Sequence, residues 1–174
     1  MKTALILLAA AIPAIAQQGF DFKSLDKLGA NATESTNITL EGDTLKLATS
    51  FLGDDKSVFR SLTGVYVRSF EFAKEGQYKE ADLAPLRAYI RKLQWTKIVD
   101  VKEAEETSEI YLLPLPNNRL GGLAIVSAEP KEVTVVFISG NLKISDIGKL
   151  SGSMGIPEIN LNHEGKKSEA QKKD

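Results

Sequence analysis

The chain has 174 residues, of which 43% are hydrophobic and 26% are charged. This is the balance of a soluble globular protein, and the length predicts a single folded domain, since domains usually run to about 100–200 residues. The formal charge is −1, from 22 basic and 23 acidic residues. Such a balance gives no strong field of either sign, so we expect neither nucleic acid nor an anionic membrane as the main partner.

The first sixteen residues have the three regions of a secretory signal peptide. A positive start at Lys2 precedes an uninterrupted apolar run over 4–12, and Ala14-Ile15-Ala16 forms an Ala-x-Ala cleavage signal. The apolar run is shorter than the roughly 20 residues that a membrane-spanning helix needs. The sequence therefore predicts a signal peptide at 1–16 and an exported protein, either periplasmic or secreted.

The absence of cysteine narrows the chemistry of an exported protein. It excludes disulfide bonds, thiol catalysis and cysteine-based zinc sites. It also excludes a lipid-modified cysteine after cleavage, so we expect no membrane anchor. Stability must come from the hydrophobic core.

Short helices and strands are expected in the first third of the mature chain. Ser24 is a plausible N-cap for a helix that Gly29 ends, and 37–41 alternates as a half-buried strand does. Gly42-Asp43 then opens a helix. Its apolar stripe comprises Leu45, Ala48 and Leu52, widened by Leu47 and Phe51. A second short helix over 58–62 is expected to stop at Gly64.

The middle of the chain predicts one strand and the clearest helix. Residues 65–72 place Val65 and Val67 on one face and aromatic residues on the other. Asp82 has the character of an N-cap, and Pro85 is tolerated in a first helical turn. The helix then carries one apolar stripe at steps of three, four and three, formed by Leu83, Leu86, Ile90 and Leu93.

From Trp95 onward the hydrophobic period changes to two. Strands are expected near 96–102, 108–115, 120–127 and 132–139. Their short connections predict antiparallel neighbours, hence a C-terminal β-meander. The last strand is apolar on both faces, which is typical of a central strand, and Gly140-Asn141 is expected to turn it into a helix ending near Leu150. The tail over 158–174 is polar, and we expect it to be disordered.

The fold expected from these elements is α+β. It has a largely antiparallel sheet of about six strands, with three or four helices packed mainly on one face. The domain is expected to occupy 17–157. The segment 38–47 also resembles 137–144, since both pair a strand and a glycine with Leu-Lys-aliphatic. Either a strand–turn–helix unit was duplicated, or both segments follow the ordinary preference of such turns for glycine before Asp or Asn.

The order of elements and the closing stretch Gly140-Asn141-Leu142-Lys143-Ile144-Ser145-Asp146-Ile147-Gly148-Lys149-Leu150 carry a family resemblance. The chain resembles a bacterial family of small exported proteins catalogued as a domain of unknown function, over roughly 20–156. The resemblance implies an exported single domain and transfers no site residues. Many members of that family are lipid-anchored, whereas this chain lacks the cysteine that such an anchor needs.

No catalytic constellation is visible. The one histidine, His163, lies in the polar tail, so Ser-His-Asp arrangements and histidine-rich metal sites are not expected. The candidate carboxylates for glycoside chemistry are Asp54, Asp55, Asp100, Glu103, Glu105, Glu106 and Glu109. The Asp54–Asp55 pair and the cluster from Glu103 to Glu109 are interpreted as solvated turn charge. The glycine-rich segment 148–155 is read as a helix end instead of a phosphate loop.

Six basic residues can form a patch if the helix over 83–93 lies beside the strand over 65–72. They are Arg60, Arg68, Arg87, Arg91, Lys92 and Lys97. The aromatic residues that a nucleic-acid surface needs are too few among them.

The function expected from the sequence is that of an exported, non-enzymatic module of uncharacterised family that binds a protein or envelope component. The alternatives are a small-molecule or lipid carrier and a carboxylate-dependent hydrolase. The sequence assigns no catalytic residue, cofactor or metal ligand, and leans against an enzyme. Neither the partner nor the oligomeric state follows from it.

Overall fold

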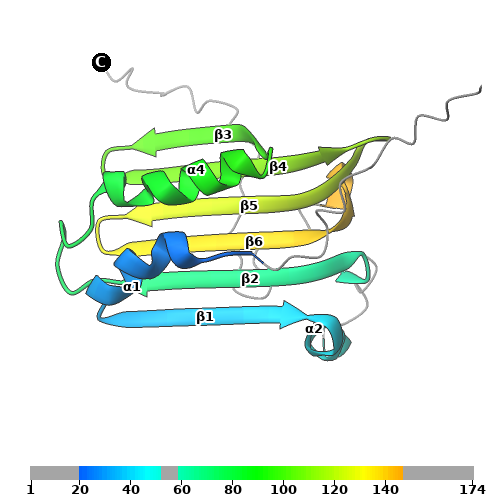
Figure 1. Ribbon diagram of the computed structural model, residues 1–174, viewed down its shortest axis with the longest axis horizontal. Helices are drawn as coiled ribbons and strands as arrows, with labels where there is room; N and C mark the ends of the chain where they lie inside the picture. Colours follow the sequence, from blue (N-terminus) through cyan, green and yellow to red (C-terminus); the bar gives the residue numbers. More distant parts are fainter. Residues whose placement is uncertain (1–19, 52–58, 147–174) are drawn as a thin grey trace, which may run out of the picture.

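The computed structural model describes residues 20–51 and 59–146, which build one open antiparallel sheet (Figure 1). Its six strands lie in the order β1-β2-β6-β5-β4-β3. Their bounds are β1 Glu34–Glu41, β2 Leu62–Glu71, β3 Thr96–Glu103, β4 Glu106–Leu115, β5 Arg119–Glu129 and β6 Glu132–Lys143. The last four strands form a meander, and β6 lies inside the sheet between β2 and β5, as the sequence predicts.

Three α-helices are described, α1 Asp26–Asn31, α2 Gly42–Ser50 and α4 Ala84–Lys92. Three short 3₁₀ turns accompany them, η1 Lys23–Leu25, η2 Glu80–Leu83 and η3 Ile144–Asp146. In Figure 1, α1 and α4 lie across one face of the sheet, whereas α2 sits at the end of β1. The predicted α+β class with a C-terminal meander is confirmed.

The face beneath α1 and α4, which we call the helix-covered face, holds an aromatic core. Phe137 of β6 is fully buried at its centre and stacks on Phe20, with ring centroids 4.3 Å apart. Leu86 and Ile90 of α4 are 1% and 0% exposed and join the same core. The apolar stripe predicted for this helix is therefore its buried face, although Leu93 at the helix end is only half-buried.

On the opposite face of the sheet, side chains of similar chemical type form rows that run across the strands. At one end lies a row of glutamates, one from each strand, which in strand order are Glu34, Glu71, Glu132, Glu129, Glu106 and Glu103. Next comes a row of mainly hydroxyl side chains, then rows of aliphatic residues that include the fully buried Val136 and Ile138. Strict alternation and a shared register align these bands, because each side-chain row runs across the strands.

The first elements differ from their predicted bounds. Ser24 does not cap a helix, because η1 already begins at Lys23 and the Ser24 hydroxyl has no hydrogen-bond partner. Helix α1 continues through Gly29 to Asn31. In α2 only Leu45 is buried, whereas Leu47 and Phe51 are 62% and 80% exposed, so the predicted widening of the stripe is wrong.

Further differences lie around the second strand. β1 begins at Glu34, three residues earlier than predicted, because pairing with β2 recruits polar residues whose period is weak. Residues 62–64, expected in a helix and its stop, instead begin β2. Asp82 lies inside η2 and accepts a hydrogen bond from the backbone N–H of Lys79 at 2.9 Å, so the helical segment starts before the predicted cap.

The Gly140-Asn141 pair does not turn the chain into a helix. β6 runs through both residues to Lys143, followed only by η3 in the described part. Gly140 is required there for close approach, because a Cβ would lie 2.4 Å from the carbonyl oxygen of Ser61. Gly42, by contrast, does open a helix after a strand, so the two similar segments have different structures.

Several predictions fall outside the described residues. They are the signal peptide at 1–16, the polar tail at 158–174, the glycine-rich segment 148–155, His163, and the Asp54–Asp55 pair. The domain bounds at 17–157 likewise remain predictions.

Candidate functional site

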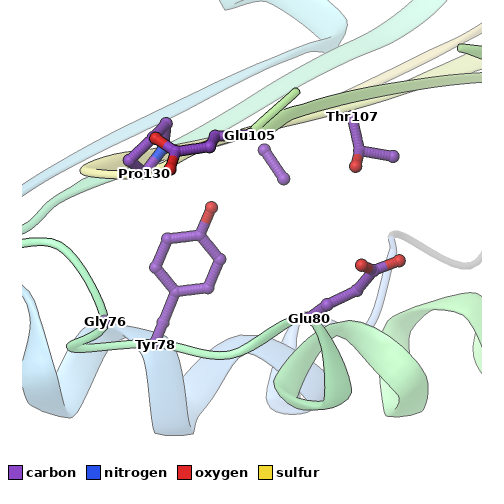
Figure 2. A pocket seen from close by; sticks show the side chains of 7 residues that line it. Gly76, Tyr78, Glu80, Glu105, Thr107 and Pro130 are labelled. Carbon is purple, nitrogen blue, oxygen red and sulfur yellow. The ribbon is translucent and has the colours of Figure 1, made fainter. Parts of the chain in front are cut away.

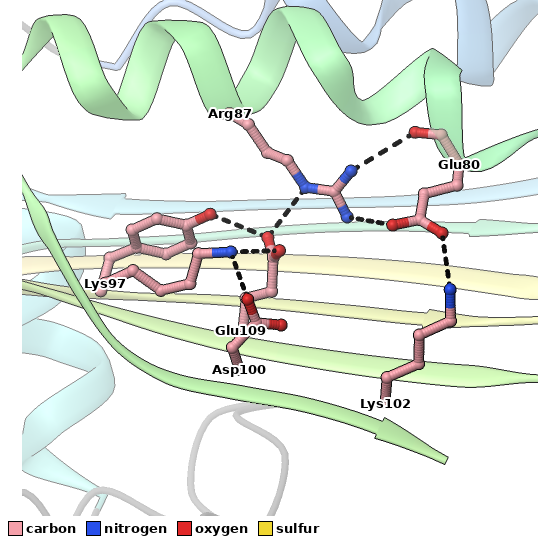
Figure 3. Close-up of polar contacts among 7 residues, drawn as sticks. Glu80, Arg87, Lys97, Asp100, Lys102 and Glu109 are labelled. Atoms are coloured by element: carbon pink, nitrogen blue, oxygen red, sulfur yellow. Dashed lines mark hydrogen bonds and ion pairs between the residues drawn. The ribbon is translucent and has the colours of Figure 1, made fainter. Parts of the chain in front are cut away.

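Glu109 is the one buried charged residue in the described part of the chain, with 3% of its surface exposed. It lies on β4 beneath α4, and three donors surround its carboxylate (Figure 3). Arg87 Nε donates to Oε2 at 3.0 Å, the Tyr111 hydroxyl to Oε2 at 2.8 Å, and Lys97 Nζ to Oε1 at 2.9 Å. We call this cluster the Glu109 clamp. It ties α4 to β3 and β4 across the helix-covered face.

The clamp holds its carboxylate ionised. Burial alone would raise the pKa of Glu109, but the hydrogen bonds from Lys97, Tyr111 and Arg87 outweigh it and hold that pKa below its usual range. Burial and the Glu109 charge together raise the pKa of Tyr111 to about 12. An ionised carboxylate that accepts three hydrogen bonds has no proton to give, so the clamp is suited to stability rather than to general acid catalysis. Reading Glu109 as solvated turn charge is therefore wrong.

A small pocket of about 160 Å³ lies between the loop before η2 and the ends of β4 and β5 (Figure 2). Glu80 and Glu105 both line it, which is the arrangement that a carboxylate-dependent hydrolase requires. The Glu80 carboxylate, however, already pairs with Arg87 at 3.3 Å and with Lys102 at 3.7 Å. The Tyr78 hydroxyl donates to the Glu129 carbonyl, and burial raises the pKa of Tyr78. Of the two carboxylates at the pocket, Glu80 is therefore held in ion pairs, so the pocket does not present two free carboxylates.

A larger groove of about 390 Å³ lies between α1 and the β1–β2 pair, on the helix-covered face. We call it the Arg68 groove. Phe22, Leu25 and Phe70 give it an apolar wall, and Arg68 lies among polar residues of β1 at its base. Ser35 and Asn37 project from β1 into the lining, and both are exposed. The strand alternation accounts for this placement, because Asn37 pairs with Arg68 and Ser35 with Phe70.

Arg68 is half-buried and held firmly in place. Its Nη1 donates to the carbonyl oxygens of Ile38 at 2.6 Å and Val67 at 2.8 Å, and its Nη2 donates to Thr39 Oγ1 at 2.9 Å. The guanidinium carbon lies 4.0 Å from the centre of the Phe22 ring, a cation–π contact. Burial lowers the pKa of Arg68 from its usual value. Within the described residues, no carboxylate lies within 4.0 Å of its guanidinium, in contrast to Arg87.

The remaining acidic candidates do not gather at one site. Asp100 pairs with Lys97 at 2.7 Å beside the clamp. Glu103 and Glu106 face each other at the β3–β4 turn, and Glu105 lies in the turn itself. Across residues 20–51 and 59–146, no group of three or more His, Asp or Glu side chains is placed to hold a metal ion.

The basic patch, which was expected only if the helix over 83–93 lies beside the strand over 65–72, does not form. α4 lies across β4 and β5 rather than beside β2 (Figure 1), so Arg87 and Lys97 meet at Glu109 while Arg68 lies at the other side of the sheet. Of the helices that the structure describes, none combines the length and the apolar character needed to cross a bilayer.

The chain matches the model of one protein family, described as Domain of unknown function (DUF4252), over residues 28–150. The match covers most of the chain and the whole sheet, so the protein belongs to this family. A search of curated proteins and a search of solved structures each found no significant match. The family assignment confirms the resemblance inferred from the sequence, and it names no activity.

Sequence reasoning missed the contrast between Glu109 and Arg68. Both residues stood among the candidates, but pattern alone places neither a donor around Glu109 nor an empty space beside Arg68. One signal was available for Glu109, since it shares its strand face with the apolar Tyr111 and Leu113. No comparable signal distinguishes Arg68, because its environment depends on where the chain before β1 folds back.

Proposed function

We propose that this protein is an exported, non-enzymatic module that binds a polypeptide partner along the open edge of β1. Export rests on the signal-peptide pattern of the first sixteen residues. Binding rests on a difference between the two edge strands of the sheet, β1 and β3.

The β3 edge has the features that protect an edge strand from pairing with another chain. Its register with β4 shifts between Lys97 and Val99, so the strand is irregular at that point. It also carries the charged residues Lys97, Asp100, Lys102 and Glu103. Bulges and charged side chains, lysine above all, are the usual means by which proteins prevent edge-to-edge association.

The β1 edge has none of these features between its ends. Its eight residues pair with β2 in an unbroken register, and residues 35–40 carry no charge. Ile38 and Leu40 are half-buried, so the strand is anchored to the apolar second face, and no strand of the described residues pairs with its outer side. An extended segment of a partner can add to such an edge through main-chain hydrogen bonds, which is a common mode of peptide recognition.

A carboxylate-dependent hydrolase has weaker support. The Glu109 carboxylate is fully bonded in the clamp, and Glu80 in the small pocket is paired with two cations. The hydrogen bonds in the clamp hold the pKa of Glu109 below its usual range, whereas a general acid needs a raised one.

The test is capture of partners from a cell-envelope extract by the native protein and two matched variants. Thr36→Lys places a charge on the β1 edge, and Val101→Lys places one in the same side-chain row on the β3 edge. Thr36 lies on the face opposite the Arg68 groove, so its substitution leaves the groove intact. We expect Thr36→Lys to lose a partner that the native protein and Val101→Lys retain. A partner kept by all three proteins, or a hydrolytic activity lost with one carboxylate, would contradict the proposal.

A further inference from the structure

Arg68 has unused hydrogen-bonding capacity that points to a ligand. A guanidinium carries five N–H donors. The contacts to Ile38, Val67 and Thr39 use both donors of Nη1 and one of Nη2. The Nε–H and one Nη2–H are left without an acceptor among the described residues. In a guanidinium, these two groups can point the same way and form the fork that binds a carboxylate through two parallel hydrogen bonds.

The charge of Arg68 also lacks a counterpart. Arg87 lies on the same face near the opposite edge of the sheet and is also half-buried. It contacts two carboxylates, Glu109 and Glu80. Arg68 contacts only neutral oxygens and the Phe22 ring. Because a partly buried charge is costly unless it is paired, an anion at this position gains attraction without first displacing a protein carboxylate.

The space beside Arg68 has the size and lining of a small-molecule site. Its volume of about 390 Å³ falls within the roughly 300–1,000 Å³ typical of ligand pockets. Phe22, Leu25 and Phe70 offer an apolar wall, while Ser35 and Asn37 offer polar groups near the cation. A ligand with an apolar body and a charged end matches this division.

We propose that the Arg68 groove binds a small molecule with a single carboxylate on an apolar body. One guanidinium fork matches one carboxylate. The exposed Asp26 at the rim disfavours a second negative group, and so a phosphate ester with nearly two charges. This site is separate from the β1 edge proposed for a polypeptide, because the groove opens on the helix-covered face.

The test uses octanoate as the probe and octanamide as its uncharged counterpart, with affinity measured by calorimetry on the purified protein. We expect octanoate to bind at least about tenfold more tightly than octanamide, since losing a charge-assisted hydrogen bond typically costs an order of magnitude or more. Arg68→Gln is expected to lose that advantage, and Arg68→Lys to keep part of it because the charge remains without the fork. Equal affinity for the two probes, or an unchanged preference in Arg68→Gln, would overturn the proposal.

Two further variants serve as controls. Arg91→Gln removes an exposed arginine from α4, away from the groove, and is expected to leave octanoate affinity unchanged. Asp26→Asn is expected to leave it unchanged or to tighten it, because a repelling charge is removed. Loss of octanoate binding in Asp26→Asn would mean that the site needs both charges, and a single-carboxylate ligand would then be the wrong class. A thermal unfolding profile like that of the native protein shows that each variant is folded.

Discussion

The two edges of the sheet differ in how their charged side chains are paired, and we call them the β3–β4 side and the β1–β2 side after their strands. On the β3–β4 side, the buried Glu109 carboxylate accepts hydrogen bonds from Arg87, Lys97 and Tyr111. The outer strand β3 has a register shift and carries charged residues. On the β1–β2 side, Arg68 has no carboxylate partner among the described residues, and the outer strand is regular and uncharged between its ends. We call the β3–β4 side, whose charged groups are paired within the protein, the closed side, and the β1–β2 side the open side.

This difference separates stability from binding. Groups that satisfy one another within the protein stabilise the fold and have little left for a partner. Groups left unsatisfied at a partly buried position lower stability, and they persist where a ligand or partner uses them. The open side is therefore where we place function, and substitutions on each side can test the contrast part by part.

The largest effect is expected from Glu109→Gln. The amide keeps the shape of the side chain but removes the one buried charge of the clamp, so Arg87 keeps only Glu80 and Lys97 only Asp100 as acidic partners. Removing one partner of a buried ion pair typically costs about 3 kcal/mol or more. Urea unfolding should therefore show a loss of about that size. The matched control is Asp100→Asn, whose side chain is 59% exposed, and we expect it to change stability by less than about 1 kcal/mol.

The same substitution should alter the response to acid. The pKa of Glu109 is lower in the folded protein than in the unfolded chain, so its stabilisation is complete above the unfolded pKa and is lost as the pH falls toward the folded pKa. Native protein should therefore lose more stability between neutral and acidic pH than Glu109→Gln does. Parallel stability profiles for the two proteins would show that the clamp does not contribute as described.

The next prediction compares the loss of stability on replacing each of two arginines on the same face. Arg87→Met leaves Glu109 with fewer donors and is expected to cost about 2 kcal/mol. Arg68→Met removes a partly buried charge that has no carboxylate partner among the described residues, so we expect a change within about 1 kcal/mol. Thermal or urea unfolding of the two variants gives the comparison directly. Equal losses in both would remove the distinction between the closed and open sides.

The smallest effect concerns the glutamate row, which both sides share. Burial, then the charges of Glu106 and Glu132, raise the pKa of Glu129. A raised carboxyl pKa lowers stability at neutral pH, and stability is regained as the pH falls through the folded pKa toward the unfolded one. Because Glu129 is exposed and solvent screens its charge, Glu129→Gln should stabilise the protein at pH 7 by only about 0.5 kcal/mol. A loss of stability at pH 7 would contradict this account of the row.

The sheet was largely predictable because hydrophobic alternation carries it. The strands from β3 onward and the helix containing Leu86 and Ile90 lie close to where their periods place them. The continuation of β6 through Gly140 was not predictable in this way. Gly140 looks like a turn residue, and only the nearby Ser61 carbonyl shows that it serves close packing inside a strand.

The sites escaped prediction for a related reason. Glu109 and Arg68 are each one charged residue in a strand, and their roles depend on which distant residues approach them. Arg87 and Lys97 reach Glu109 from a helix and a neighbouring strand. Phe22 reaches Arg68 from the chain before α1. Long-range contacts of this kind leave no period in the sequence.

The central claim is that the β1–β2 side binds a polypeptide partner and that the β3–β4 side does not. The most direct measurement is site-specific photocrosslinking in cells, with the reactive group at Thr36 on β1 or at Val101 in the same side-chain row on β3. We predict that Thr36 forms an adduct with a polypeptide and that Val101 forms none. An adduct from Val101 alone, or equal adducts from both positions, would contradict the account.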